Sequence, residues 1–154
     1  MKEIKIRAWD KFNKVMVYSD KNYPLSEYKI EFDWTNENKL SLMKLIDARY
    51  VEFRTFDADI MQSTGLEDKN GKEIYTGDII KVLRKHWNNC GKEYLEKITE
   101  EIGEVVFYKN WEISLKTKEK EGTLYQPFLW MFEDEEDHQI EIIGNIYENK
   151  DLLK

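Results

Sequence analysis

Histidine and cysteine are few in this chain and widely spaced, although carboxylates are many. His86 and Cys90 stand four residues apart, a spacing that places two side chains on one face of a helix, and His138 lies far along the sequence. A zinc site needs three or four such ligands, and no second pair accompanies the first. We therefore interpret the spacing as incidental and expect no metal site and no cofactor.

Residues Asp68–Gly71 resemble the centre of a calcium-binding loop. If Gly71 takes the sixth place of such a loop, the first and twelfth places fall on Leu66 and Gly77, where calcium needs carboxylates. Calcium binding is therefore not expected here.

Recognisable catalytic motifs are absent from the sequence. It has no Gly-x-Ser-x-Gly nucleophile elbow, no phosphate-binding P-loop and no Rossmann glycine fingerprint. Distant carboxylates that meet only in the fold leave acid–base catalysis open. The sequence nevertheless favours a noncatalytic protein.

Two surfaces are candidates for binding. The first is aromatic: Tyr108, Trp111 and Tyr125 lie on or near strands, and they could stack on the bases of a single-stranded nucleic acid. Neighbouring lysines would supply positive charge: Lys109, Lys116, Lys118 and Lys120. The alternative, which we favour, is a packed aromatic core with lysines on its wet side. The second is the acidic run Glu133–Asp137, which could meet a cation or a basic partner, although such runs are usually solvated loops.

Charge is unevenly distributed along the chain. Residues 1–60 hold 11 basic and 11 acidic side chains, whereas residues 61–154 hold 13 basic and 20 acidic ones, which accounts for the formal charge of −7. An acidic second half argues against a broad electrostatic grip on phosphates. Nucleic acid is therefore possible but not favoured.

The single cysteine, Cys90, excludes an intrachain disulfide and suits a reducing compartment. The first residues do not form a signal peptide, and no apolar run is long enough to span a bilayer. We expect a cytoplasmic protein without a membrane partner.

Short strands and turns outnumber helices in the predicted elements. The strands expected from apolar alternation are 4–9 (with one face in water), 15–18, 28–34, 50–56, 79–83, 104–108, 111–115, 128–132 and 140–147. Short helices are expected at 37–47 and 92–101, with 84–101 a polar excursion between strands. The pattern predicts an all-β or β-dominated fold of antiparallel sheets, with a small, partly open barrel of SH3 or OB type in the second half. A boundary near residues 57–66 divides a β-rich region 1–60 from a barrel-like region 61–154, unless the two form one continuous domain.

Three sequence blocks carry a family resemblance. They are Arg7-Ala-Trp-Asp10, then Met61–Leu66 with Asp68–Tyr75 and Gly77–Ile79, and finally Ile143–Asn149. Together, in this order and over nearly the full length, they resemble the YopX family of phage and prophage proteins. The resemblance implies a β-rich fold and no assigned catalytic residues, cofactor or substrate.

The signature positions are mostly types that shape turns or fill a core. They are Arg7, Trp9, Asp10, Gln62, Thr64, Gly65, Leu66, Asp68, Asn70, Gly71, Tyr75, Gly77, Asp78, Gly144, Asn145, Tyr147 and Asn149. Glycines suit turns or close backbone approach, and aspartates accept hydrogen bonds from backbone N–H groups in turns. We therefore expect these residues to be structural.

The function favoured by the sequence is a noncatalytic phage or prophage accessory protein that binds another macromolecule, a host or phage protein, in the host cytoplasm. The alternatives are a small nucleic-acid-binding barrel and a self-assembling structural protein, that is, a homo-oligomer.

Overall fold

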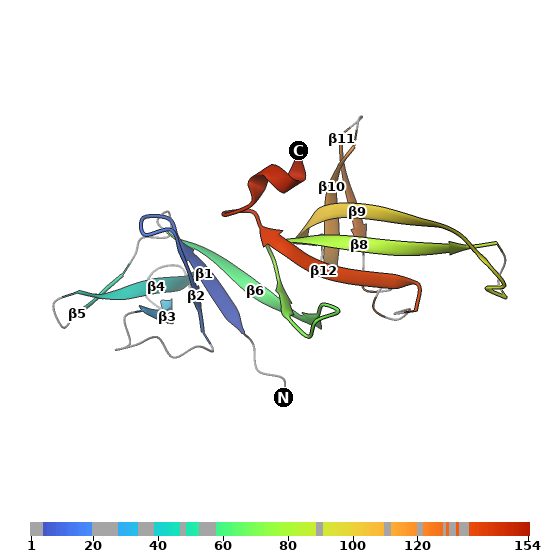
Figure 1. Ribbon diagram of the computed structural model, residues 1–154. Coiled ribbons are helices and arrows are strands. Elements are labelled where there is room, and N and C mark those ends of the chain that lie inside the picture. Colours follow the sequence, from blue (N-terminus) through green and yellow to red (C-terminus); the bar gives the residue numbers. More distant parts are fainter. Residues whose placement is uncertain are drawn as a thin grey trace. The chain divides into compact units, whose positions relative to one another are not determined.

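The chain is built almost entirely from antiparallel β-strands, as predicted (Figure 1). The computed structural model describes residues 5–19, 28–33, 39–46, 49–52, 58–88, 91–109, 112–119, 122–127, 129, 132 and 136–154. These residues belong to two compact units, Met1–Ser63 and Thr64–Lys154.

The first unit contains six strands. They are β1 (Ile6–Asp10), β2 (Val15–Tyr18), β3 (Tyr28–Asp33), β4 (Lys39–Ile46), β5 (Arg49–Glu52) and the first part of β6 (Ala58–Glu67). β1 lies between β2 and β6, whereas β3, β4 and β5 form a separate three-stranded sheet. A small core of Ala8, Val17 and Ala58 packs with partly buried hydrophobic side chains, including Tyr28 and Ile30 of β3.

Two expectations for this unit were wrong. The predicted wet face of β1 does not exist: Arg7 is 2% exposed and Ala8 is 0% exposed, although consecutive strand residues point to opposite faces. Both faces of β1 are therefore covered. The helix predicted over 37–47 is strand β4, which pairs with β3 on one side and β5 on the other. Hydrogen bonds in those two ladders pair the backbone groups of β4, and this tertiary pairing outweighs the weak helical spacing of its apolar residues.

The second unit holds the remaining strands and one short 3-10 helix. They are β7 (Glu73–Tyr75), β8 (Asp78–Trp87), β9 (Leu95–Tyr108), β10 (Glu112–Glu119), β11 (Gly122–Pro127), β12 (His138–Asn145) and η2 (Lys150–Leu153). Five of them form one sheet in the order β11-β10-β9-β8-β12, whose two edge strands are not hydrogen-bonded to each other. In Figure 1, β10 and β11 cross the direction of β8, so the sheet coils like half of a barrel.

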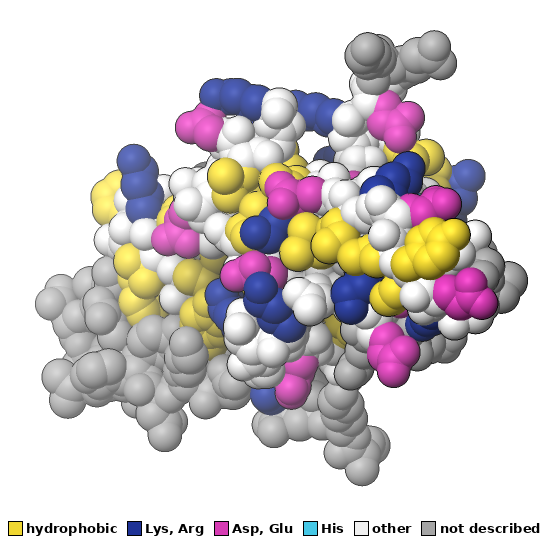
Figure 2. Space-filling view, turned by 45° about the vertical axis from the view of Figure 1, so that its right-hand side comes forward, with side chains coloured by type: hydrophobic (Ala, Val, Ile, Leu, Met, Phe, Trp, Pro, Cys, Tyr) yellow, Lys and Arg dark blue, Asp and Glu magenta, His cyan; other side chains and the backbone are white. Residues whose placement is uncertain are grey.

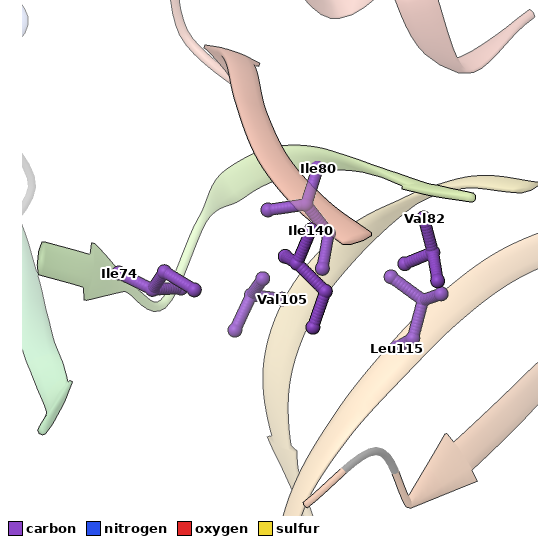
Figure 3. Close-up of a cluster of buried hydrophobic side chains, with 6 residues drawn as sticks. All are labelled: Ile74, Ile80, Val82, Val105, Leu115 and Ile140. Atoms are coloured by element: carbon purple, nitrogen blue, oxygen red, sulfur yellow. The ribbon is translucent and has the colours of Figure 1, made fainter. Parts of the chain in front are cut away.

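One face of this sheet carries the main hydrophobic core. The side chains of Ile80, Val82, Val105, Leu115 and Ile140 converge there, and Ile74 of β7 joins them (Figure 3). Gly103 lies where β10 leaves β9. A Cβ at this position would stand 2.7 Å from Cδ1 of Leu115 and 2.8 Å from the carbonyl oxygen of Lys116, so only glycine fits the close approach.

The β8–β9 hairpin extends past the rest of the sheet. β12 leaves β8 at Arg84, and β10 pairs with β9 only from Glu104 onward, whereas β8 and β9 continue pairing as far as Trp87 and Leu95. We call residues 85–100 the arm.

The arm corrects two further predictions, a polar excursion at 84–101 and a helix at 92–101. Residues 95–100 are all exposed, so neither face is buried and the alternation that marks a half-buried strand is missing.

The strand predicted over 128–132 is also wrong at the residues that the structure describes. β11 ends at Pro127, and the Phe132 N–H donates to the Leu129 carbonyl at 3.0 Å, which closes a turn. Within the described ranges, no helix combines the length and the apolar character needed to cross a membrane.

Candidate binding surfaces

Asp10 organises the turn after β1. Its carboxylate accepts the N–H groups of Phe12 and Asn13, both at 2.9 Å, and the Tyr28 hydroxyl at 3.1 Å. Burial alone would raise the pKa of Asp10, but these hydrogen bonds, with one from the Asn13 amide, outweigh it and hold the pKa below its usual value. The carboxylate is therefore a structural acceptor and is not open to a ligand.

Asp68 plays the same part in the second unit. It accepts the N–H groups of Asn70 (2.8 Å) and Lys72 (3.0 Å) within its own turn and that of Ile142 (3.1 Å) on β12. Burial would raise its pKa, and the hydrogen bonds reverse the shift so that the pKa of Asp68 is lowered. Gly71 completes this turn with a φ of +75°. The hydrogen bond from Ile142 thereby links this turn to β12, which is distant in sequence.

A second tight turn joins two of the signature blocks. Asp78 accepts the Tyr75 N–H at 2.8 Å across it. Gly77, at a φ of +80°, donates to the Val105 carbonyl at 2.8 Å and accepts the Ile146 N–H at 2.9 Å. The middle and C-terminal blocks therefore meet through backbone hydrogen bonds.

In the C-terminal block, side-chain oxygens accept hydrogen bonds from backbone N–H groups of the same block. Oδ1 of Asn145 accepts the N–H groups of Tyr147 and Glu148, both at 3.0 Å, and Oδ1 of Asn149 accepts the Asn145 N–H at 3.2 Å. A Cβ on Gly144 would lie 2.6 Å from Oδ1 and 2.7 Å from Cβ of Asn149. Gly144 is thus a site of close approach.

Gly144→Ala should destabilise the second unit by about 2 kcal/mol, since the added methyl group overlaps Asn149 and forces the loop to move. Urea unfolding followed by circular dichroism measures this. Asn149→Gly in the same chain removes the colliding side chain, so the double variant should lose less stability than the two single variants added together. Simple additivity would contradict the proposed collision.

Other signature residues lie in several different settings. Trp9 and Tyr75 are buried, Leu66 packs against the core of the second unit, Gly65 has a φ of +75°, and Gln62 is exposed opposite Ile6. The Thr64 hydroxyl donates to the Ile74 carbonyl at 2.8 Å. Tyr147 lines one hollow in the surface, and Asp68 and Asn70 line another.

The structure brings together two of the three predicted surface aromatics. The rings of Tyr108 and Tyr125 stack with centroids 4.1 Å apart and planes 9° from parallel, and Lys109 Nζ lies 5.3 Å from the Tyr108 centroid. Trp111 lies outside the described residues. Because each tyrosine covers a face of the other, the pair is less open to an intercalating base than three separate rings would be.

A hollow of about 380 Å³ lies beside this sheet. Its lining combines sheet residues with C-terminal ones: Glu104, Lys116, Thr117, Lys118, Ile146, Tyr147, Lys150 and Leu153. Lys116 donates to Glu104 at 2.8 Å, and this hydrogen bond raises the pKa of Lys116. The hollow therefore holds three ammonium groups and one carboxylate next to apolar side chains.

A second hollow, of about 440 Å³, lies against the Asp68 turn and β12. Its lining includes His138, Phe132 and two carboxylates, Glu67 and Asp68. Asp68 accepts hydrogen bonds from backbone N–H groups, whereas Glu67 is exposed.

The remaining sequence candidates do not converge. His86 hydrogen-bonds the Thr99 hydroxyl at 2.8 Å, and Cys90 lies outside the described residues. From the acidic run, Asp137 accepts the indole N–H of Trp87 at 2.6 Å and pairs with Lys92 at 2.9 Å. In the described part of the chain, no three His, Cys, Asp or Glu side chains are grouped to hold a metal ion.

The arm displays hydrophobic side chains. Tyr94, Leu95 and Ile98 are 64%, 41% and 56% exposed. In the ladder Ile98 stands opposite Lys85, and Leu95 opposite Trp87. Figure 2, which brings this side of the molecule forward, shows a band of hydrophobic side chains between charged ones. Exposed hydrophobics gathered on one projection are typical of a protein-binding surface.

A family model described as YopX protein matches residues 5–154. The chain belongs to the YopX family. The resemblance drawn from the three sequence blocks is therefore confirmed.

One solved structure agrees with this membership at the level of the fold. The crystal structure of YopX from Bacillus subtilis is 21% identical, covers 97% of this chain and 98% of its own, and superimposes with a TM-score of 0.58. Protein EF1440 from Enterococcus faecalis is 22% identical over 99% of both chains, with a TM-score of 0.45. Among curated proteins, none matches the sequence.

The sequence analysis did not single out two surface features of this YopX-family chain, the hollow beside η2 and the arm. Lys150 and Leu153 lie outside any motif, and it is the fold that places them beside Glu104 of β9 and Lys116 of β10 in the lining of the hollow. The hydrophobic residues of the arm were visible in the sequence, but the segment was interpreted as a polar excursion.

Proposed function

We propose that this YopX-family chain is a noncatalytic binding module that captures another protein through the arm. As an accessory protein of phage or prophage origin, it acts in the host cytoplasm on a host or phage protein. The observation that supports this proposal is that Tyr94, Leu95 and Ile98 are exposed on a two-stranded projection.

The edge of the arm suggests how the partner binds. Among the described strands, β9 has no neighbour on its second side before Glu104, so the backbone N–H and C=O groups there can accept another strand. An extended segment of a partner protein would add to this edge, and its apolar side chains would cover Leu95 and Ile98. Charged side chains at Glu96, Lys97 and Glu100 would discourage indiscriminate pairing.

The buried carboxylates support a binding role more than a catalytic one. Among the residues that the structure describes, the buried carboxylates are Asp10, Asp68 and Asp78, and each accepts hydrogen bonds from backbone groups. A general acid or base must be free to exchange a proton with substrate, and these three are occupied.

Ile98→Lys should weaken partner capture about tenfold, because it places a charge within the apolar contact that strand addition would bury. Tagged protein is incubated with nuclease-treated bacterial lysate, and captured proteins are quantified by mass spectrometry. Val15→Lys, at a β-branched strand residue that is 39% exposed in the first unit, is the matched control. Equal capture by both variants would exclude the arm as the binding surface.

A further inference from the structure

The hollow next to η2 has two kinds of wall. Ile146, Tyr147 and Leu153 provide apolar surface on the C-terminal side, whereas Lys116 and Lys118 rise from β10 and Lys150 from η2. Its volume of about 380 Å³ lies in the range of roughly 300–1,000 Å³ that small-molecule sites occupy.

The charge in the hollow favours an anion. Lys116 is held by Glu104 at 2.8 Å, which neutralises one of the three lysines. Lys118 and Lys150 are both exposed and add two positive charges at the rim. This local excess contrasts with residues 61–154 as a whole, which carry 20 acidic and 13 basic side chains.

Aromatic surface continues from the hollow along the sheet. Tyr125 stands opposite Lys116 in the β10–β11 ladder and therefore on the same face. The stacked pair Tyr108–Tyr125 spans β10 near Ser114, whose side chain is 1% exposed. Flat apolar surface thus borders the cationic rim.

We propose that this hollow binds a nucleotide unit, one base with its 5′-phosphate. The base lies against Tyr147 and Leu153, and the phosphate is bound by the ammonium groups of Lys118 and Lys150. A single nucleotide needs only this local positive charge, whereas the net negative charge of residues 61–154 disfavours binding of a long phosphate backbone. The bound nucleotide is either a free nucleoside monophosphate or one nucleotide of a single-stranded nucleic acid.

The test titrates the full chain with the four ribonucleoside 5′-monophosphates, with adenosine and with a short oligothymidylate, each at low salt. Binding is followed by calorimetry and by the NMR shifts of the Tyr147 ring. We expect a monophosphate or the oligonucleotide to bind and adenosine to bind at least about tenfold more weakly, since it lacks the charged contact. If the chain binds a free monophosphate more tightly than the oligonucleotide, the ligand is the free nucleotide. The reverse preference identifies a single-stranded nucleic acid as the source.

Lys150→Glu and its matched control Lys97→Glu make the same charge change at exposed lysines, one in the hollow and one on the arm. Lys150→Glu should raise the dissociation constant about tenfold or more, whereas Lys97→Glu should leave it nearly unchanged. Equal weakening by both variants would reveal a nonspecific charge effect and overturn the proposal. Absence of binding by every monophosphate and by the oligonucleotide at millimolar concentration would overturn it as well. Neither result bears on protein capture by the arm.

Discussion

Leu115→Ala should lower the free energy of unfolding of the second unit by about 3 kcal/mol. Leu115 is 0% exposed and packs with Val82 and Val105 in the main core. Removing its three terminal carbons forfeits their transfer free energy and leaves a cavity that a curved sheet cannot readily close. Urea titration followed by circular dichroism gives the change.

Leu95→Ala is the matched control for this prediction. It makes the same substitution at a side chain that is 41% exposed on the arm, so its cost should stay below about 1 kcal/mol. Equal losses in the two variants would mean that Leu115 does not occupy a packed core.

Asp68→Ala should destabilise the same unit by a comparable amount, about 3 kcal/mol. The substitution leaves the N–H groups of Asn70, Lys72 and Ile142 without their acceptor, and each unsatisfied group costs about 1–3 kcal/mol if water cannot reach it. Asp151→Ala, at an exposed carboxylate in η2 that pairs with Lys154, should change stability by less than about 1 kcal/mol. A loss as small for Asp68 as for Asp151 would show that the turn does not depend on the carboxylate.

The effect of Asp68 should depend on pH in a defined direction. Its folded pKa is lowered, so its ionised form stabilises the fold above the unfolded pKa of about 3.9 and that contribution disappears as the pH falls through the folded pKa. The stability gap between wild type and Asp68→Ala should therefore be constant near neutrality and shrink below about pH 4. Asp10 shifts in the same direction and should add to the acid sensitivity of the wild-type chain.

Local alternation predicted where several strands lie. The segment 28–34 alternates cleanly, and its residues 28–33 form β3; β9 and β10 pair as the hairpin predicted from 104–108 and 111–115, with Glu112 opposite Tyr108. Alternation did not predict burial equally well, because the consecutive residues Ser114 and Leu115 are 1% and 0% exposed, so both faces of β10 are covered there.

The same reasoning failed where burial follows no period. In β1 both faces are covered, and in the arm residues 95–100 are exposed on both, so neither segment shows the expected pattern. For β4, the spacing of Leu42, Leu45 and Ile46 fits one face of a helix, and only pairing with β3 and β5 decides for a strand. Such pairing partners are not visible locally.

The candidate surfaces were predictable only in part. The sequence singled out Tyr108 and Tyr125 but not their mutual stacking, which depends on β10 lying between β9 and β11. The turn roles of Asp68 and Asp78 were deduced from residue type alone, because aspartate side chains act on backbone groups close in sequence. The reach of Asp68 to Ile142 required the fold.

The long β8–β9 hairpin also bears on how the chain folds. Its ladder starts at Trp87 and Leu95, which are near neighbours in sequence, so closing it loses little chain entropy. Pairing of β1 with β6, by contrast, joins Ile6 to Gln62. A much longer loop must close, and its chain entropy is lost before any contact between the strands can compensate for it. We therefore expect the hairpin that carries the arm to form early, before the later strands of its sheet pair with it, and the pairing of β1 with β6 to form more slowly.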